Sequence, residues 1–335
     1  MTQNISPWVG RWLTLIAIMI AAMVVVGGAT RLTGSGLSIT EWAPIVGTLP
    51  PLSDADWQLA FSKYQNTSQF KLQNSAMTLP EFHSIFWWEW AHRFLGRLIG
   101  FAVAVPLIVF AWRKILPVGL WPRIAMLLVL GAAQGLLGWF MVASGLQDRV
   151  SVTQYRLAAH LTFATILFAY VIWLRLTLTQ KVKLNWGWPA LVLAMIFVQI
   201  AAGGFVAGLN AGQGYNTWPL MDGTFIPDGL LAMQPSWLNV FENALTVQFD
   251  HRILAYVIFT IAIIQAWLNR GNAQLMLVAV IILQIMLGII TLVTHVPMLM
   301  ALLHQACALL VLSAAIWNLK VSSERNGIPI GWPAA

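Results

Sequence analysis

The stretch FWWEWAHRFLGRLIG, from Phe86 to Gly100, marks the point where an aromatic segment becomes a membrane-spanning helix. Three tryptophans precede the apolar residues, and tryptophan is a side chain enriched at membrane–water interfaces. On a helix, Glu89, His92 and Arg93 share one face, because residues three and four positions apart are neighbours. A second stretch, VQFDHRILAY from Val247 to Tyr256, again opens an apolar helix with His-Arg. The chain therefore makes the same kind of junction twice.

The composition around these junctions is that of a membrane protein. Of the 335 residues, 59% are hydrophobic and only 9% are charged, which excludes an ordinary soluble domain. A helix needs about 20 apolar residues to cross the hydrocarbon core of a bilayer. Runs of this kind lie at 12–30, 92–112, 124–143, 157–178, 189–208, 251–268, 275–294 and 299–319. The sequence predicts an all-α integral membrane protein with eight transmembrane helices.

The charged residues divide unequally between the two sides of the membrane. Eight spans place both termini on one side, which carries ten of the 18 Lys and Arg residues and a single acid, Glu324. The opposite side carries the other eight cations and ten acids. Because cytoplasmic loops carry an excess of Lys and Arg, both termini are expected in the cytoplasm. This distribution accounts for the net charge of +7 without a nucleic-acid partner.

The second half of the chain repeats motifs of the first. The matching motifs are Gly27-Gly28 with Gly203-Gly204, and TEWAPIVGTLP (Thr40–Pro50) with NTWPLMDGTFIP (Asn216–Pro227). We interpret them as an internal duplication of a four-helix unit, with one bundle in residues 1–183 and the other in 184–335. Because four is even, both copies insert in the same orientation, related by a pseudo-twofold axis along the membrane normal.

Short helices are expected outside the spans. One side of a helix from Asp54 to Ser68 would carry Trp57, Ala60, Phe61 and Tyr64, a pattern typical of a helix lying on the membrane interface. Thr78-Leu-Pro-Glu81 resembles a capping box, which predicts that the second spanning helix begins outside the membrane. Asn239-Val-Phe-Glu242 offers another capping box in the second half.

Four of the six histidines occupy matched places, His92 and His160 in the first half and His251 and His304 in the second. All lie at the outer ends of even-numbered spans. In an up-down-up-down bundle the second and fourth helices are diagonal and run in the same direction, so their histidines face each other. That geometry suits bis-imidazole ligation of a haem iron. Zinc fits less well, because two imidazoles per site are too few. A single histidine of this kind is as often a packing residue.

The two halves differ in one charged residue. Three positions before His92 stands Glu89, but three before His251 stands Gln248. Two alike haems that only pass electrons have no evident use for this difference, whereas an enzyme with one cofactor site and one substrate site has. Arginines near the histidines could pair with haem propionates or extend to the interface by snorkelling; they are Arg93, Arg97 and Arg252.

The motifs GGATRLTGSGLSITEW (Gly27–Trp42) and FWWEWAHRFLGR (Phe86–Arg97), with the paired His-Arg helices, resemble the haem A synthase family over essentially all eight spans. The resemblance implies an oxidoreductase that converts the C8 methyl group of haem O into a formyl group, by two hydroxylations and loss of water, giving haem A for terminal oxidases. It leaves the oxygen source, the electron acceptor and the precise role of the carboxylate open.

The resemblance also implies the sites. A haem b cofactor would be held in the C-terminal half, with its iron on His251 and His304 and with Arg252 nearby. The substrate haem would lie in the N-terminal half, with Glu89 as the essential carboxylate; its binding residues would be His92, His160, Arg93 and Arg97. Some members carry a cysteine pair in an outer loop, but this chain has only Cys307, within a span, so that role does not transfer.

The implied location is the inner membrane of a bacterium, with the haem sites near the periplasmic face. The implied partners are haem O and membrane lipid, with the haem O-producing farnesyltransferase and an oligomer as further candidates.

Two other classes of function are open. A dihaem b-type electron-transfer cytochrome shares the four histidines but not the Glu89 asymmetry. A transporter built from parallel repeats is disfavoured because the ionisable residues lie at the outer rim rather than at the midplane.

Overall fold

The computed structural model describes residues 5–43, 46–146, 149–179, 182, 184 and 186–326, and within these ranges the named regular elements are all helices. Eight of them are long and apolar enough to cross a membrane. They are α1 (Pro7–Leu32), α4 (Leu79–Trp112), α5 (Trp121–Gly145), α6 (Gln154–Leu176), α7 (Trp188–Gly208), α10 (Ala244–Asn269), α11 (Asn272–Val293) and α12 (Met298–Asn326). The prediction of an all-α, multi-pass membrane protein is confirmed.

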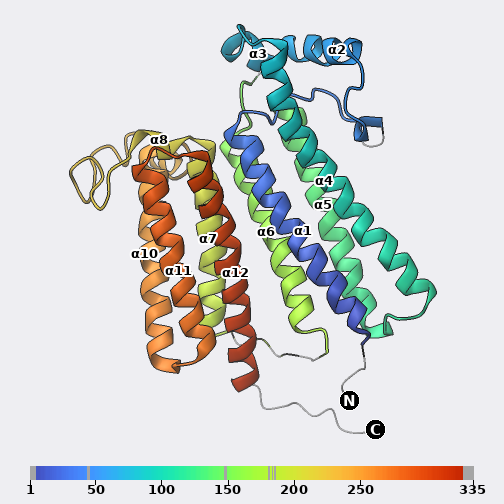
Figure 1. Ribbon diagram of the computed structural model, residues 1–335. Coiled ribbons are helices and arrows are strands. Elements are labelled where there is room, and N and C mark those ends of the chain that lie inside the picture. The colour runs from blue at the N-terminus through green and yellow to red at the C-terminus, as the bar shows by residue number, and fades with distance from the viewer. Residues whose placement is uncertain are drawn as a thin grey trace.

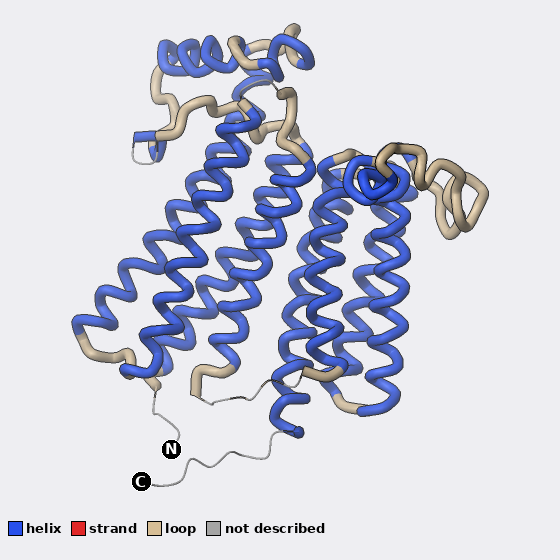
Figure 2. The backbone as a smooth tube through the Cα atoms, turned by 180° about the vertical axis from the view of Figure 1, so that it is seen from behind, coloured by secondary structure: helices blue, strands red, loops and turns tan. Residues whose placement is uncertain are grey.

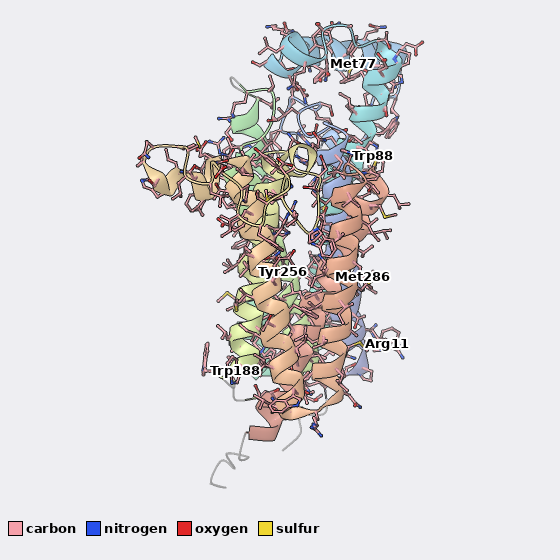
Figure 3. The ribbon with its side chains drawn as sticks, turned by 90° about the vertical axis from the view of Figure 1, so that its left-hand side faces the viewer. Arg11, Met77, Trp88, Trp188, Tyr256 and Met286 are labelled. Carbon is pink, nitrogen blue, oxygen red and sulfur yellow. The ribbon has the colours of Figure 1, made fainter. Side chains whose placement is uncertain are left out.

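The spans stand side by side in two groups of four (Figures 1 and 2). We call the end where α1 begins and α12 ends the proximal end, and the opposite end the distal end. Figure 3 places Arg11 and Trp188 near the proximal end and Trp88 towards the distal end. Tryptophans near both ends are what two membrane interfaces favour.

The two groups close differently. In the last four spans, α7 packs on α10, α10 on α11, α11 on α12, and α12 back on α7, which makes a closed ring. In the first four, α1 packs on α4 and α6, and α5 on α6, but α4 and α5 make hardly any close backbone contact within the described ranges. The first group therefore does not close into a ring of packed helices.

Glycines bring the two groups into contact. A Cβ added to Gly204 or Gly208 of α7 would lie 2.7 Å from the Cα of Ala158 or 2.5 Å from the Cα of Gln154, both in α6. These small residues let the two helices approach closely. At the distal end Arg31, near the end of α1, donates hydrogen bonds to the carbonyl of Ala207 and to the side-chain oxygen of Asn210.

The main apolar core fills only the proximal part of the bundle. In α6, α10 and α12 its buried residues begin after His160, His251 and His304, and in α4 its buried residue is Phe110. In α1, the last buried core residue is Val24. None of the core's buried residues among the described ranges lies distal to the level of the four histidines. The distal part of the spans is thus built around other groups.

Outside the spans, α2 (Asp54–Gln65) and α3 (Ser68–Gln73) sit over the distal extension of α4 (Figure 1). The expected short helix is present, and its apolar side packs against α4, because α4 is 34 residues long and its first turns offer an apolar face of their own. The cluster contains Phe61, Tyr64, Phe82, Ile85 and Phe86. Ser53 and Asp56 form a capping box at the start of α2.

The predicted capping box at the start of α4 is confirmed, since the backbone N–H of Thr78 donates to Glu81 at 2.7 Å. The one predicted at Asn239–Glu242 is wrong. Those residues form a separate turn, α9, and α10 begins at Ala244 with Asn243 as its cap. The side chain of Asn239 instead bonds both backbone groups of Met233, which ties down the preceding loop.

The remaining short elements are η1 (Val46–Thr48), η2 (Val118–Leu120), α8 (Ala211–Gly214) and η3 (Ser236–Leu238). The basic linker at Lys181 and Lys183 and the loop residue Asp148 lie outside the described residues. The division of the chain at residue 183 and the pseudo-twofold axis therefore stay predictions.

Candidate functional site

Each of the four predicted histidines lies against a glycine on the neighbouring helix. A Cβ on Gly138, Gly203 or Gly288 would lie 3.0, 3.2 or 2.8 Å from the Cε1 atom of a histidine ring. The rings belong to His160, His251 and His304 respectively. At Gly27 the nearest atom is Nε2 of His92, at 3.1 Å. A Cβ at Gly288 would clash with the ring, and a Cβ at any of the other three positions would be in unusually tight contact with it, so the glycines let the rings lie close to the neighbouring helices.

Three of the histidines also contact a glutamine one turn from that glycine. The side-chain amide nitrogen of Gln134 lies 3.2 Å from Nδ1 of His160 and donates to its backbone carbonyl at 3.2 Å. Gln199 does the same with His251, at 3.1 and 3.0 Å. The Gln284 amide nitrogen lies 3.3 Å from Nε2 of the remaining histidine, His304.

His92 is the exception. The residue one turn before Gly27 is Met23 rather than glutamine, and its terminal methyl group would lie 3.1 Å from a Cβ on Gly96. His92 forms no hydrogen bond to the part of the chain that the structure describes.

The histidines form two pairs. His92 and His160 lie within range of electrostatic interaction, and so do His251 and His304. No group of three or more His, Cys, Asp or Glu side chains that could hold a metal ion occurs among the described residues. Two pairs of imidazoles, at the level where the apolar core stops, suit a large planar ligand that takes one axial nitrogen from each side.

Glu89 is 2% exposed, and both of its carboxylate oxygens are occupied. Oε2 accepts from the Ser38 hydroxyl at 2.8 Å and from the Ile39 backbone N–H at 2.7 Å. Oε1 accepts from Nε and Nη2 of Arg93, at 3.0 and 2.5 Å. Arg93 also donates to the carbonyls of Ile39 and Glu41. The pair clamps the loop that follows α1 onto α4.

The matching positions in the other half form a clamp without a carboxylate. Gln248 is 3% exposed and donates to the carbonyls of Ala211 and Tyr215 at 3.0 and 3.1 Å. Arg252 donates through Nη2 to Gln248 at 2.9 Å and to the Tyr215 carbonyl at 3.0 Å. The loop after α7 is therefore held by an amide where the loop after α1 is held by an ion pair.

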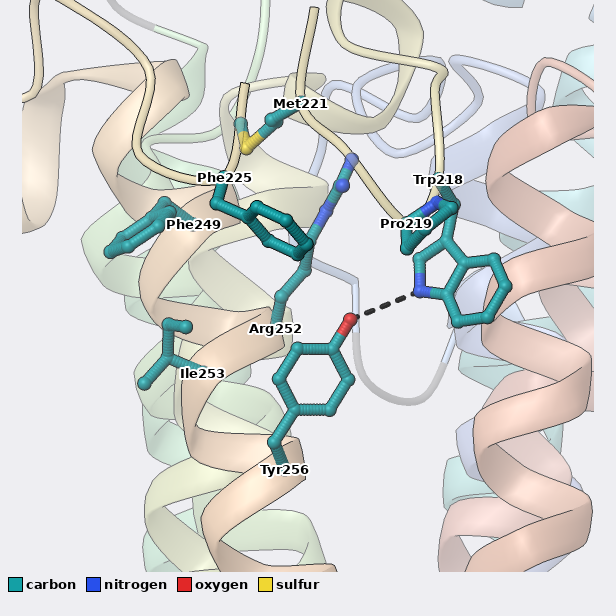
Figure 4. A pocket seen from close by; sticks show the side chains of 8 residues that line it. All are labelled: Trp218, Pro219, Met221, Phe225, Phe249, Arg252, Ile253 and Tyr256. Carbon is teal, nitrogen blue, oxygen red and sulfur yellow. Dashed lines mark hydrogen bonds between the residues drawn. The ribbon is translucent and has the colours of Figure 1, made fainter. Parts of the chain in front are cut away.

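Arg252 lines a cavity of about 270 Å³ at the distal end of α10 (Figure 4). Trp218 and Tyr256 border it and are joined by a hydrogen bond of 3.0 Å. The Nε and Nη1 atoms of Arg252 are buried and have no hydrogen-bond partner among the described residues. A buried guanidinium with unused donors fits an anionic group such as a carboxylate.

The other predicted arginine, Arg97, donates to the backbone carbonyl of Ala43 at 3.0 Å, so it too contacts the loop after α1.

Outside the spans, burial raises the pKa of the Tyr64 hydroxyl. Hydrogen bonds from Ser53 and Leu52 lower the pKa of Asp56.

The structure brings the four histidines together in the predicted pairs, but their contacts with glycine and glutamine were not predicted from the sequence. A glutamine four residues before a glycine occurs at Gln134, Gln199 and Gln284, each in the span beside a histidine span. This repeated Q-x-x-x-G spacing, with methionine in the fourth case, was a signal available in the sequence. The partners of Glu89 left no such signal, because a loop some fifty residues away has no period.

The chain is similar throughout to a family of known proteins. The COX15-CtaA family model, described as cytochrome oxidase assembly protein, matches residues 10–316. The heme A synthase of Parvibaculum lavamentivorans is 48% identical over 316 residues, covering 92% of each chain. That of Rhodopseudomonas palustris BisA53 is 50% identical, covering 92% of this chain and 89% of its own. That of Azorhizobium caulinodans is 47% identical and covers 94% of each.

Proposed function

Because the chain belongs to the COX15-CtaA family of cytochrome oxidase assembly proteins, we propose that it is a haem A synthase. It is an oxidoreductase of haem A biosynthesis that acts on haem O within the membrane. The reaction removes electrons from the C8 methyl group and leaves a formyl group there. The proposal rests on two pairs of histidines that lie where the apolar core stops. A buried carboxylate lies beside only one of these pairs.

We assign the cofactor to the last four spans, within residues 184–335. His251 and His304 would hold the iron of haem b, and Arg252 would bind a propionate. The fit rests on the two unused N–H donors of Arg252 and on the glycines that seat both rings. When bound, haem b supplies one-electron transfer. The closed helix ring and the glutamines Gln199 and Gln284 keep its ligands in place.

We assign the substrate to the first four spans, within residues 1–183. His92 and His160 would bind the iron of haem O. Arg93 and Arg97 hold the loop after α1, and Arg97 carries charge towards the propionates. The loose packing of α4 against α5 suits a substrate that arrives from the lipid, because haem O is membrane-soluble.

Glu89 supplies negative charge close to the reacting carbon in this proposal. Four hydrogen bonds already engage both oxygens of its carboxylate. Neither oxygen is left free to take a proton from the substrate, so the arrangement suits stabilisation of positive charge at the C8 carbon better than proton abstraction. Electrostatic stabilisation of this kind typically contributes about 100-fold or more in rate.

The protein would lie in the bacterial inner membrane with both termini in the cytoplasm and the histidine levels towards the periplasm. The support is the excess of Lys and Arg on the terminal side. Reporter fusions after Arg113 and near Asp54 test this orientation, and are expected to report cytoplasm and periplasm respectively. The farnesyltransferase that makes haem O remains a candidate partner, since its product is this enzyme's substrate.

The deciding experiment is conversion of haem O by the purified protein, read by extracting the pigments. We expect haem A and a hydroxylated intermediate to appear while the haem b content stays constant. If haem O is returned unchanged while haem b still cycles between its redox states, the alternative of a dihaem b-type electron-transfer cytochrome gains and the synthase proposal is lost.

A further inference from the structure

Three of the four histidines contact a glutamine side chain, and His92 does not. The side-chain amides of Gln134, Gln199 and Gln284 contact the rings of three of them. His92 has Met23 at that place instead and makes no hydrogen bond within the described residues. Ring placement divides them in the same way, because His92 alone turns a nitrogen, Nε2, towards the glycine of its neighbouring helix.

The residue one turn after each histidine follows the same division. Ala164, Ala255 and Ala308 follow the three histidines that contact glutamine, and Gly96 follows His92. The missing methyl group at Gly96 is what the Met23 side chain occupies, since its Cε would lie 3.1 Å from a Cβ there. Met23 and Gly96 thus form an apolar pair beside His92, where the other three histidines have a glutamine and an alanine.

We propose that His92 is the exchangeable iron ligand of the substrate site, and that Met23 is the positioning residue that leaves its ring free to turn. The proposal rests on the assignment of the substrate to the first four spans. A ring with no hydrogen bond can rotate without losing one, and His92 must turn Nε2 away from α1 before that nitrogen meets an iron.

The chemistry of a substrate site explains why such a ligand is useful. A cofactor remains bound through many turnovers, so both of its ligands gain from being held. A substrate must enter and its product must leave, and each event breaks the bonds from iron to both histidines. Retaining Gln134 on His160 while omitting a glutamine on His92 leaves one fixed and one releasable ligand. The loose packing of α4 against α5 in the same bundle is consistent with this division.

The test measures haem transfer rather than turnover. Protein containing haem b is loaded with ferric haem O, mixed with excess apomyoglobin, and followed by the absorbance of the haem that moves. Met23→Gln is expected to slow transfer about five- to tenfold, the effect of one additional hydrogen bond. Gln134→Met, the reverse change at the other ligand, is expected to speed transfer by a similar factor.

Two controls separate the possible causes. Met23→Leu keeps an apolar side chain and should transfer haem O at the wild-type rate; if it slows transfer as Met23→Gln does, the effect is one of packing and the proposal fails. Gln199→Met should accelerate loss of haem b and leave haem O transfer unchanged. The haem b content of the Met23 and Gln134 variants reports their folding, and far-UV circular dichroism reports that of Gln199→Met.

The outcomes are distinguishable from failure of the proposed function. Wild-type protein that binds haem O and releases it, but makes no haem A, leaves the exchange proposal standing and removes the synthase proposal. Wild-type rates in both Met23→Gln and Gln134→Met overturn the exchange proposal, whatever the activity. Absence of haem O binding by the wild-type protein overturns both.

Discussion

In the first four spans Arg93 pairs with a carboxylate, Glu89, whereas Arg252, at the matching place in the last four, is bonded to an amide, Gln248. Both arginines hold the loop that follows the first helix of their group. In the first group the guanidinium charge is neutralised within the protein. In the second, Asp222 lies within electrostatic range of the guanidinium but forms no ion pair with it among the described residues, and two of the Arg252 nitrogens have no hydrogen-bond partner there.

This difference agrees with the proposed assignment of one ligand to each half. Buried N–H donors without a partner are costly, so Arg252 gains when a permanent anionic group reaches its two unused nitrogens. The Glu89–Arg93 ion pair needs no such group, because the donors of Arg93 are already used within the protein. Helix packing differs in the same way. The closed helix ring of the second group suits a cofactor that is retained, and the loosely packed α4 and α5 of the first suit a substrate that exchanges.

The largest expected effect is on the resident cofactor. His251→Ala or His304→Ala should remove low-spin haem b almost completely from the purified protein, because the described ranges around each ring offer glycine and glutamine rather than a substitute ligand. His92→Ala or His160→Ala should keep haem b and lose binding of haem O. The optical spectrum and pigment extraction read both. Loss of haem b in the His92 and His160 variants instead would reverse the assignment of the two halves.

The next effect is on the reaction. Glu89→Gln should lower haem A formation about 100-fold or more while haem b is retained. Gln has one acceptor and one donor group where four donors meet, so its NH₂ must face either Arg93 or the Ser38–Ile39 pair. Pigment extraction after turnover with haem O gives the measurement. Activity near the wild-type level would show that no charge is needed at this position.

The matched control is Gln248→Glu, which places a carboxylate against the carbonyl oxygens of Ala211 and Tyr215. This change should weaken retention of haem b and leave binding of haem O as it was. Measured together, the two variants test whether each clamp serves its own half. A Gln248→Glu protein that keeps haem b but loses haem O binding would mean that the clamps act across the interface.

The sequence alone was sufficient for the spans and for the histidine levels, because both depend on hydropathy, length and repetition. His92, for example, is placed by its distance from the start of an apolar run and by its match with His251. The clamp around Glu89 could not be predicted, because its partners Ser38 and Ile39 belong to a loop without periodicity. The false capping box at Asn239 has the same cause: its side chain bonds a loop, which a local motif does not reveal.

A smaller effect should come from the glycine that seats one substrate ligand. A Cβ on Gly138 would lie 3.0 Å from the His160 ring, whereas nothing lies within 4 Å of a Cβ on Gly135. Overpacking typically costs about 1–3 kcal/mol, so Gly138→Ala should weaken haem O binding about tenfold. Gly135→Ala, three residues away in α5, should leave it unchanged. Equal binding in both variants would remove the glycine from the site.

The last variant distinguishes two roles of Glu89, its charge in the reaction and its hydrogen bonds to the loop after α1. Ser38→Ala removes the 2.8 Å hydrogen bond to Oε2 but leaves the Ile39 N–H and both Arg93 contacts in place. A hydrogen bond to a charged group is worth about 1.5 kcal/mol or more, so haem A formation should fall about tenfold, with haem b content unchanged. If Ser38→Ala were as damaging as Glu89→Gln, holding the loop would be the main task of the carboxylate. A tenfold loss against a hundredfold loss would instead assign most of the effect to the charge itself, because Ser38→Ala keeps both the negative charge and the other contacts to the loop.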